Sequence, residues 1–357
     1  MAINIDKTKY FGNLFYSNVS PSGSTISVKL PNEMCLIIVA AEMRGYQWEI
    51  IPGTFVTQIS NENKNIFFYQ SKLPTQPFIS QRLCLDKYST KVFLKRAGIK
   101  TPSGFVVGEK METHELISVF DSLSKPLVVK PLHGTEGASV SMNIENTEDY
   151  LNAVHQARIS NAYDKNSDVL VEEQIFSNNE YRLIVLDGKL LSCLQKTPFF
   201  VVGDGKQTIA QLVQQANKDP LRNISSTLYP LVELDSTMSA SLSKLGFTSE
   251  TVLENGETVR LRDLSNIMAG GFAENLDLKV NPALDNLAKK IMQAIPGLQY
   301  CGIDIVINDL YDCADYSVIE INSAPSFDMN EIPQIGESAA IADAILDYLF
   351  SEVRLSP

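Results

Sequence analysis

The alternation of apolar and polar residues predicts a β-hairpin near the C-terminal end of the chain. Two short apolar runs, residues 302–307 and 316–321, flank a polar tract that holds three aspartates. Runs rich in β-branched residues on both sides of an Asp-rich tract are typical of a hairpin. If it folds symmetrically about its centre, Asp304 lies opposite Glu320. Asn322 then shares a face with Glu320, because strand residues two apart point the same way.

These three side chains are a candidate metal site. Mg²⁺ takes hard oxygen ligands and completes its shell with water and substrate phosphates. The alternative is an ordinary hairpin with an acidic exposed face, and spacing alone does not decide between the two. The sequence EINSAP at 320–325 favours the metal site, because a solvated turn does not require an Asn two residues beyond a Glu.

Residues 1–84 predict a small α/β unit without visible chemistry. The run 34–41 reads as a buried strand leading into a helix, and 47–51 and 66–69 read as strands. A helix then begins at Asp86, a good N-cap, and ends at Gly98. Its apolar residues at helical spacing are Leu85, Tyr88, Val92 and Ala97. The cations on or near the opposite face, for which a solvated surface is the simplest interpretation, are Lys87, Lys91, Lys95 and Arg96.

A strand over 126–131 ends close to Lys130 and is followed by the glycine-bearing turn 133–138. Backbone N–H groups and an ammonium placed in this way can bind phosphates. The signal is weak alone, because it matches neither a Walker A motif nor a dinucleotide fingerprint. Further strands are predicted at 169–175, and at 181–186 and 189–194, the last two joined by the hairpin signal Asp-Gly.

Composition narrows the class of protein. The chain has 357 residues, 44% of them hydrophobic and 20% charged, which describes a soluble globular protein of two or three lobes. The net charge of −12 argues against a nucleic acid or an anionic membrane as partner. No apolar run is long enough to span a bilayer and the N-terminus lacks a signal pattern, so we expect a cytoplasmic protein. Five cysteines without a CxxC pair and three scattered histidines argue against zinc sites, a disulfide framework and Ser-His-Asp catalysis.

Six segments occur in an order that is similar to a known family. They are DKYSTKVFLKRAGIKTP (86–102), VVKPLHGTEG (128–137), VEEQIFSNNEYRLIVLDGKL (171–190), VVGDGKQTI (201–209), LRDLSNIMAGG (261–271) and the stretch from GIDIVIND to VIEINSAPSF (302–327). Over roughly residues 80–350 the chain resembles the ATP-grasp superfamily, in its carboxylate–amine ligase branch. It resembles most the ligase domains of cyanophycin synthetase and of bifunctional glutathione synthetase.

The resemblance implies an α/β (α+β) fold of three lobes, with the nucleotide between two α+β lobes. The expected boundaries are an N-terminal α/β lobe at 1–84, a central lobe with the phosphate-binding loop at 85–176, and a C-terminal lobe with the metal and substrate site at 177–357. The resemblance also implies ATP and two Mg²⁺ ions, with Mn²⁺ as the alternative ion. The expected metal ligands are Asp304, Glu320 and Asn322.

The resemblance further assigns roles in nucleotide and substrate binding. Lys87 and Lys130 would reach the nucleotide phosphates, and Glu180 the ribose, with Glu172 or Glu173 as the alternatives. The loop closing over the phosphates would include Gly134, Thr135, Gly137 and Ala138. The residues whose backbone would hold the adenine edge are Glu173, Gln174 and Ile175. Those near the reacting carboxyl group would be Arg182, Arg262 and Asn266, with Gly270 and Gly271 beside the substrate.

The implied reaction joins the carboxylate of an amino acid or short peptide to an amine. An acyl-phosphate forms first and an amide follows, with release of ADP and phosphate. An ATP-grasp phosphotransferase acting on a small hydroxylated substrate and a nucleotide-binding pseudoenzyme are the alternatives, and a homo-oligomer is compatible with each. Met268, Ala269 and Lys196 depart from the family pattern near the acceptor side, so the substrates stay open.

Overall fold

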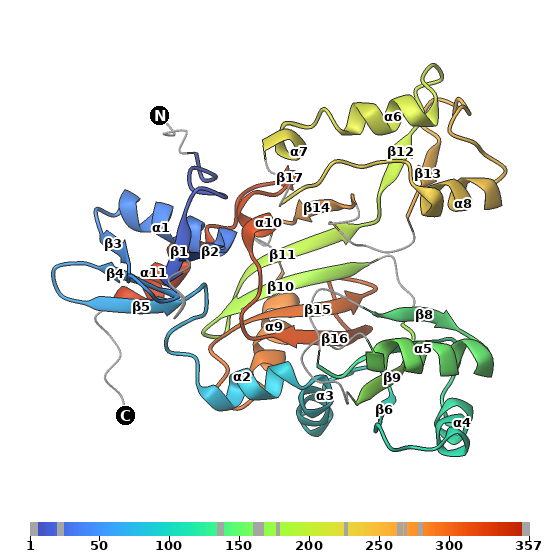
Figure 1. The fold of residues 1–357 in the computed structure, drawn as a ribbon, viewed down its shortest axis with the longest axis horizontal. Coiled ribbons are helices and arrows are strands. Elements are labelled where there is room, and N and C mark those ends of the chain that lie inside the picture. Colours follow the sequence, from blue (N-terminus) through green and yellow to red (C-terminus); the bar gives the residue numbers. More distant parts are fainter. Residues whose placement is uncertain are drawn as a thin grey trace. The chain divides into compact units, whose positions relative to one another are not determined.

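A computed structural model of the chain shows helices and strands in a mixed α and β arrangement (Figure 1). It describes residues 6–19, 25–133, 139–159, 168–175, 179–224, 228–262, 267, 270–277 and 281–351. The chain forms two units, each built from separate stretches of sequence. Unit 1 comprises Met1–Pro74, Leu191–Val280 and Ser326–Pro357, and unit 2 comprises Thr75–Leu190 and Asn281–Pro325. The lobe boundaries predicted from the sequence stay a prediction.

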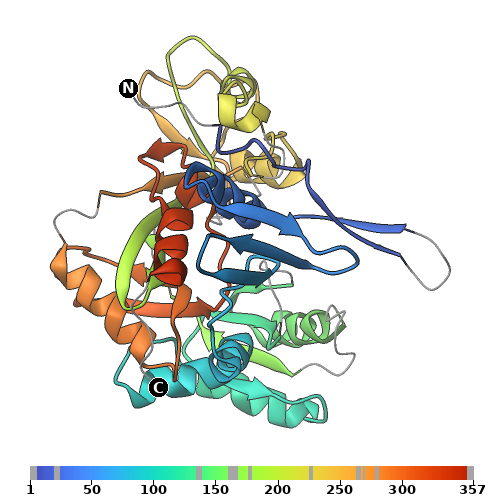
Figure 2. The ribbon, with the colours of Figure 1, turned by 90° about the vertical axis from the view of Figure 1, so that its left-hand side faces the viewer.

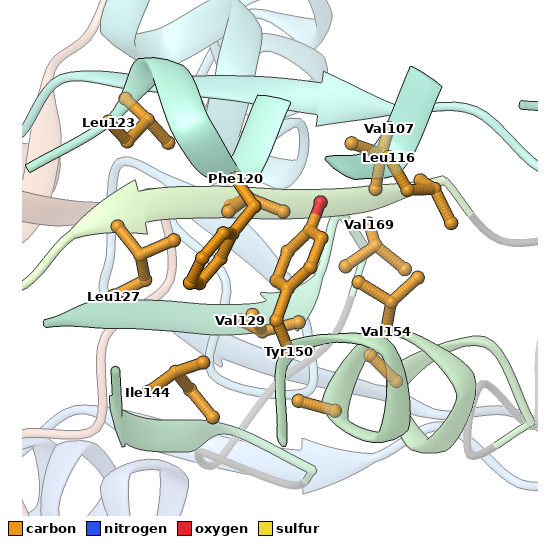
Figure 3. Packing of buried hydrophobic residues seen from close by; sticks show 13 residues of the cluster. Val107, Leu116, Phe120, Leu123, Leu127, Val129, Ile144, Tyr150, Val154 and Val169 are labelled. Atoms are coloured by element: carbon orange, nitrogen blue, oxygen red, sulfur yellow. The ribbon is translucent and has the colours of Figure 1, made fainter. Parts of the chain in front are cut away.

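Unit 2 contains an antiparallel sheet of order β6-β9-β7-β8. Side chains from α4 and α5 pack against its strands (Figure 3), where the rings of Phe120 and Tyr150 lie 5.2 Å apart. Full burial of each such apolar side chain contributes about 1.5–3 kcal/mol, so this core fixes the strand that carries Lys130. The elements are β6 (Gly104–Val107), α4 (Thr113–Ser122), β7 (Leu127–Pro131), β8 (Ser141–Ile144), α5 (Thr147–Ile159) and β9 (Val169–Glu173).

Unit 2 also contains the predicted C-terminal hairpin, formed by β15 (Tyr300–Ile307) and β16 (Tyr316–Asn322). It extends to β10 (Glu180–Leu186) in the order β16-β15-β10, all antiparallel. The Asp187-Gly188 turn after β10 has positive φ at both residues, 52° and 75°, as a type I′ turn requires. The helices of this unit outside the first sheet are α2 (Phe78–Leu85), α3 (Lys87–Arg96) and α9 (Pro282–Gln293).

Unit 1 contains several groups of hydrogen-bonded strands. Their orders are β1-β2, β3-β4-β5, β12-β13 and β11-β14-β17, and the β1–β2 hairpin extends as a two-stranded arm (Figure 2). The strands are β1 (Phe15–Val19), β2 (Thr25–Lys29), β3 (Gln47–Ile50), β4 (Val56–Ser60), β5 (Asn65–Tyr69), β11 (Lys189–Thr197, mostly in this unit), β12 (Phe200–Val202), β13 (Thr258–Arg260), β14 (Phe272–Asn275) and β17 (Ile335–Gly336). The helices are α1 (Asn32–Met43), α6 (Ile209–Ala216), α7 (Pro220–Ile224), α8 (Ser236–Lys244), α10 (Asp328–Glu331) and α11 (Ile341–Phe350).

The prediction of a strand at the start of the run 34–41 was wrong. The run lies entirely within α1, whose residues from Glu33 to Ala41 are all buried and which packs against α11 (Figure 1). A short run of consecutive apolar residues does not distinguish a buried strand from a helix that is buried all round.

Candidate functional site

Three charged side chains form a row across the sheet of unit 2. Arg182 on β10 lies opposite Asp304 on β15, which lies opposite Glu320 on β16. The guanidinium of Arg182 donates to both carboxylate oxygens of Asp304, Nε to Oδ1 at 2.9 Å and Nη2 to Oδ2 at 2.7 Å. The predicted pairing of Asp304 with Glu320 is therefore confirmed, and Arg182 pairs with a neighbouring carboxylate.

The expected metal ligands share this strand pair. Asn322 lies opposite Gly302, two residues from Asp304, so its amide is diagonal to the Asp304 carboxylate. Within the described residues, no three His, Cys, Asp or Glu side chains gather into a metal-binding group. A site here would therefore combine two carboxylates with one amide. This donor set suits Mg²⁺. The metal assignment stays a prediction.

A β-bulge lies directly beside this row. The pairing register passes from Asp304 opposite Glu320 to Ile305 opposite Val318, which leaves Ile319 as the extra residue of β16. Bulges bend a strand locally and re-aim the neighbouring side chains. The orientation of Glu320 therefore depends on what holds the backbone at Ile319.

A buried ion triad lies close to β16 in the same unit. Glu172 on β9 is 2% exposed, and its two oxygens pair separately with Lys91 and Lys130. Each nitrogen–oxygen distance is 2.6 Å. Burial opposes ionisation of Glu172, but the two ammonium groups outweigh it and hold the pKa of this carboxyl below its usual range. Both carboxylate oxygens of Glu172 are thus paired with lysines, so this residue is a poor candidate for binding the ribose hydroxyls.

Lys87 and Lys91 lie one helical turn apart on α3 and share a pocket with Glu320. Burial lowers the pKa of Lys87, and the nearby Glu320 carboxylate partly opposes this shift. Burial also lowers the pKa of Lys91, to about 8, and here Glu172 opposes the shift. The pocket is lined by Cys84, Lys87, Thr90, Lys91, Leu94, Ile319, Glu320 and Ile321.

The interpretation of α3 as a helix with a solvated cationic face was wrong for two of its four cations. Lys87 and Lys91 are buried, while Lys95 and Arg96 are exposed. The apolar residues at helical spacing face solvent instead, with Tyr88 at 39% and Val92 at 38% exposure. The two lysines can be buried because the negative charges of Glu172 and Glu320 compensate their ammonium groups. The predicted cap is confirmed, since the Asp86 side chain accepts from the N–H groups of Tyr88 and Ser89.

The segment expected to hold the adenine edge follows β9. The N–H groups of Glu173 and Gln174 donate to the carbonyls of Ser103 and Pro126 at 2.9 Å, so they are used within the protein. Ile175 is exposed, and an adenine contact would use other backbone atoms here. Glu180, half-buried at the start of β10, keeps its expected ribose role as a prediction. The predicted loop residues Gly134, Thr135, Gly137 and Ala138 lie outside the described residues.

The residues expected beside the reacting carboxyl group, other than Arg182, belong to unit 1. Arg262 donates to the Asp235 carboxylate at 2.6 Å, and Asn266 lies outside the described residues. Gly270 has φ +98°, and a Cβ there would lie 2.6 Å from Val232 Cγ2. Packing and backbone conformation already explain glycine at this position. The substrate role of Gly270 and its neighbour stays a prediction.

Sequence reasoning missed Arg222, which is 2% exposed in unit 1. Its guanidinium lies against the rings of Phe199 and Phe272 and donates to the carbonyls of Pro230 and Gly270, at 2.9 and 2.7 Å. No sequence pattern reveals a cation whose partners are backbone carbonyls. Lys91 was missed as a site residue for another reason: its i, i+4 spacing from Lys87 was visible, but the compensating Glu172 is remote in sequence.

A second buried polar cluster in unit 1 leads to a prediction about pH. Burial, and then the nearby Asp328 carboxylate, raises the pKa of Glu33 from 4.5 to about 7. The unfolded chain therefore releases this proton at lower pH than the folded chain. The free energy of unfolding should fall as the pH rises from about 4.5 to about 7.

Glu33→Gln removes this titration. Between pH 5 and pH 8 the free energy of unfolding of the natural chain should fall by about 2 to 3 kcal/mol relative to the variant. Urea unfolding followed by the fluorescence of Trp48, the single tryptophan and a residue of unit 1, measures the difference. Exposed Glu62→Gln is the control. Parallel pH profiles for the natural chain and Glu33→Gln would contradict the prediction.

Residues 84–199 match the RimK-like ATP-grasp domain. Together with the architecture, this match confirms the ATP-grasp fold class and the resemblance to ATP-grasp ligases expected from the sequence. The chain is 29% identical over 318 residues to a cyanophycin synthetase from Trichormus variabilis, covering 88% of this chain and 34% of the relative. It is 31% identical over 287 residues to a glutathione biosynthesis bifunctional protein from Listeria welshimeri, covering 78% and 35%.

The crystal structure of a bifunctional glutathione synthetase from Pasteurella multocida has a similar fold. The TM-score is 0.69 at 24% identity, covering 91% of this chain and 44% of the other. The chain thus spans about a third of the length of the two curated relatives. In its described part, none of the helices has the length and apolar character needed to cross a membrane.

Proposed function

We propose that this protein is an ATP-dependent ligase that joins a carboxylate to an amine through an acyl-phosphate. One observation carries the proposal: Asp304 and Glu320 lie opposite each other in the sheet of unit 2, and the buried cation Lys87 lies beside Glu320. Cations beside paired carboxylates are what phosphoryl transfer from a metal–nucleotide complex requires.

The residues of this unit have separate tasks in the proposal. Lys130 and Lys87 bind phosphate oxygens and neutralise charge that accumulates as the γ-phosphoryl group leaves ADP. Arg182 orients the Asp304 carboxylate through its two hydrogen bonds. The substrate carboxylate attacks the γ-phosphorus, and the amine then displaces phosphate from the acyl-phosphate.

Asp304, Glu320 and Asn322 would hold Mg²⁺. A bound ion would neutralise the phosphate oxygens and orient them for in-line transfer. The donor chemistry of the three side chains and their shared strand pair support this assignment. Mn²⁺ has similar preferences and is the alternative ion.

The substrates that we propose are an amino acid or short peptide and an amine. The names of the relatives, cyanophycin synthetase and glutathione biosynthesis bifunctional protein, support a synthetase of this kind. Fold alone does not choose the substrate, so the class rests on these relatives.

The test is a screen of purified protein with Mg²⁺ and ATP against pairs of amino acids and amines, with mass identification of products. A ligase releases ADP and inorganic phosphate in equal amounts with the amide. A phosphotransferase releases ADP and retains the phosphate on its product. Nucleotide binding without ADP release across the screen would instead support a pseudoenzyme.

Lys130→Met should raise the KM for ATP by about tenfold or more, because a buried cation next to the phosphates is lost. The exposed Lys95→Met on α3 is the control and should leave KM unchanged. An unchanged KM in Lys130→Met would contradict the phosphate role of this residue.

A further inference from the structure

The ammonium group of Lys91 is surrounded by three oxygen partners: one ion pair and two hydrogen bonds. The group carries three N–H bonds, and its nitrogen lies 2.6 Å from Glu172 Oε1, 3.0 Å from Thr101 Oγ1 and 3.2 Å from the Ile319 carbonyl. The residue is 4% exposed. An ammonium group that is buried among these three oxygen atoms is enclosed by protein, so its charge acts through its neighbours.

The first neighbour is the Glu172–Lys130 pair. With Lys91, the triad holds two positive charges and one negative charge, which leaves one net positive charge for an anion at Lys130. Without Lys91, the charges of Glu172 and Lys130 would cancel. Both oxygens of the Glu172 carboxylate would then attract Lys130. In a buried site such a pair is strong, because little water screens it.

The second neighbour is the bulge in β16. Ile319 is the extra residue of the bulge, so its carbonyl is displaced from the regular pairing, and Lys91 donates to it. Thr101 connects Lys91 to the same strand a second time. Its hydroxyl accepts a hydrogen bond from Lys91 and donates one to the Val318 carbonyl at 2.9 Å. The next residue along the strand is Glu320. Lys91 therefore links Glu172, the ion-pair partner of Lys130, to the backbone that orients Glu320.

We propose that Lys91 is a positioning residue of the nucleotide site: it preserves the charge of Lys130 and fixes the bulge beside Glu320. This deepens the proposed function and rests on it for the identity of the ligand. Lys91 touches neither the phosphates nor the metal; it acts through a carboxylate and a carbonyl.

The test measures dissociation constants for ATP by calorimetry, once in EDTA and once with excess Mg²⁺. Lys91→Met should weaken binding about tenfold in EDTA, because Lys130 loses its net charge. It should weaken binding further with Mg²⁺, because the strand that carries Glu320 is no longer fixed. The control is Lys95→Met, exposed on the same helix, which should bind like the natural chain in both conditions.

A double variant separates the two effects. Lys91→Met with Glu172→Gln carries no competing carboxylate at Lys130 and leaves the site with the same single net positive charge as the natural triad. Its affinity in EDTA should return to within about threefold of the natural chain, while the additional Mg²⁺-dependent loss should persist. A single variant that binds ATP in EDTA within twofold of the natural chain would overturn the proposal. So would a double variant that binds no better than the single one.

These outcomes are distinguishable from failure of the proposed function. The measurement needs only a natural chain that binds ATP, whether or not a substrate pair has been found. A natural chain without affinity for ATP in either condition would refute the proposed function and this inference together. If the natural chain binds ATP but releases no ADP, the ATP dissociation constants of the Lys91 variants still test this inference.

Discussion

Glu320→Gln should lower the rate of ATP-dependent turnover by about a thousand-fold while the protein stays folded. The variant keeps the size of the side chain but removes the negative charge opposite Asp304 and beside Lys87. Loss of one preorganised electrostatic group of this kind typically costs about a hundred- to a thousand-fold, and loss of a metal ligand belongs at the upper end. The measurement is the initial rate of ADP release at saturating ATP over a range of Mg²⁺ concentrations.

The matched control for this prediction is Asp121→Asn, which removes a carboxylate from the exposed surface of α4 in the same unit. It should turn over at the natural rate. Asp304→Asn should resemble Glu320→Gln, with the added loss of the bidentate Arg182 pair. Full activity of Glu320→Gln would refute the assignment of metal ligands on this strand pair.

Arg222→Met should lower the free energy of unfolding of unit 1 by about 3 kcal/mol or more. The Arg222 guanidinium lies against the rings of Phe199 and Phe272, and Met at this position would donate no hydrogen bonds to the carbonyls of Pro230 and Gly270. A buried carbonyl left without a donor costs about 1–3 kcal/mol. Urea unfolding monitored by Trp48 fluorescence reports on this unit.

Two further variants sharpen this second prediction. Arg222→Lys keeps the charge but lacks the planar fork that reaches several carbonyls, so it should recover only part of the loss. Exposed Lys218→Met, close in sequence and in the same unit, should change the free energy of unfolding by less than about 0.5 kcal/mol. An Arg222→Met variant as stable as Lys218→Met would show that the buried guanidinium contributes nothing.

The hairpin with Asp304 opposite Glu320 could be predicted from the sequence because its pattern is local. Two apolar runs on either side of a polar tract place Asp304 opposite Glu320. The bulge at Ile319, which shifts the register closer to the turn, was not predicted. The cap at Asp86 was predictable because its pattern is also local. The buried face of α3 was not, because the lysines are compensated by Glu172, which follows several other elements in the chain.

The same distinction explains the other results. Residues 34–41 form a helix because α1 is surrounded by packed side chains, and such a run has no period that separates it from a strand. Arg222 had no sequence signal because its partners are backbone carbonyls, one of them on Gly270, which is remote in sequence. Local periodicity therefore predicts elements and faces in this chain, whereas buried charges depend on contacts between remote segments.

The antiparallel partner of β10 has a consequence for synthesis on the ribosome. β10 pairs with β15, yet the whole segment from 187 to 299 is translated between them. The nascent chain therefore presents the edge of β10, including Arg182 without its Asp304 counter-ion, until β15 has been translated. An exposed strand edge invites pairing with other chains, so messages truncated before residue 300 should yield products that aggregate or bind chaperones.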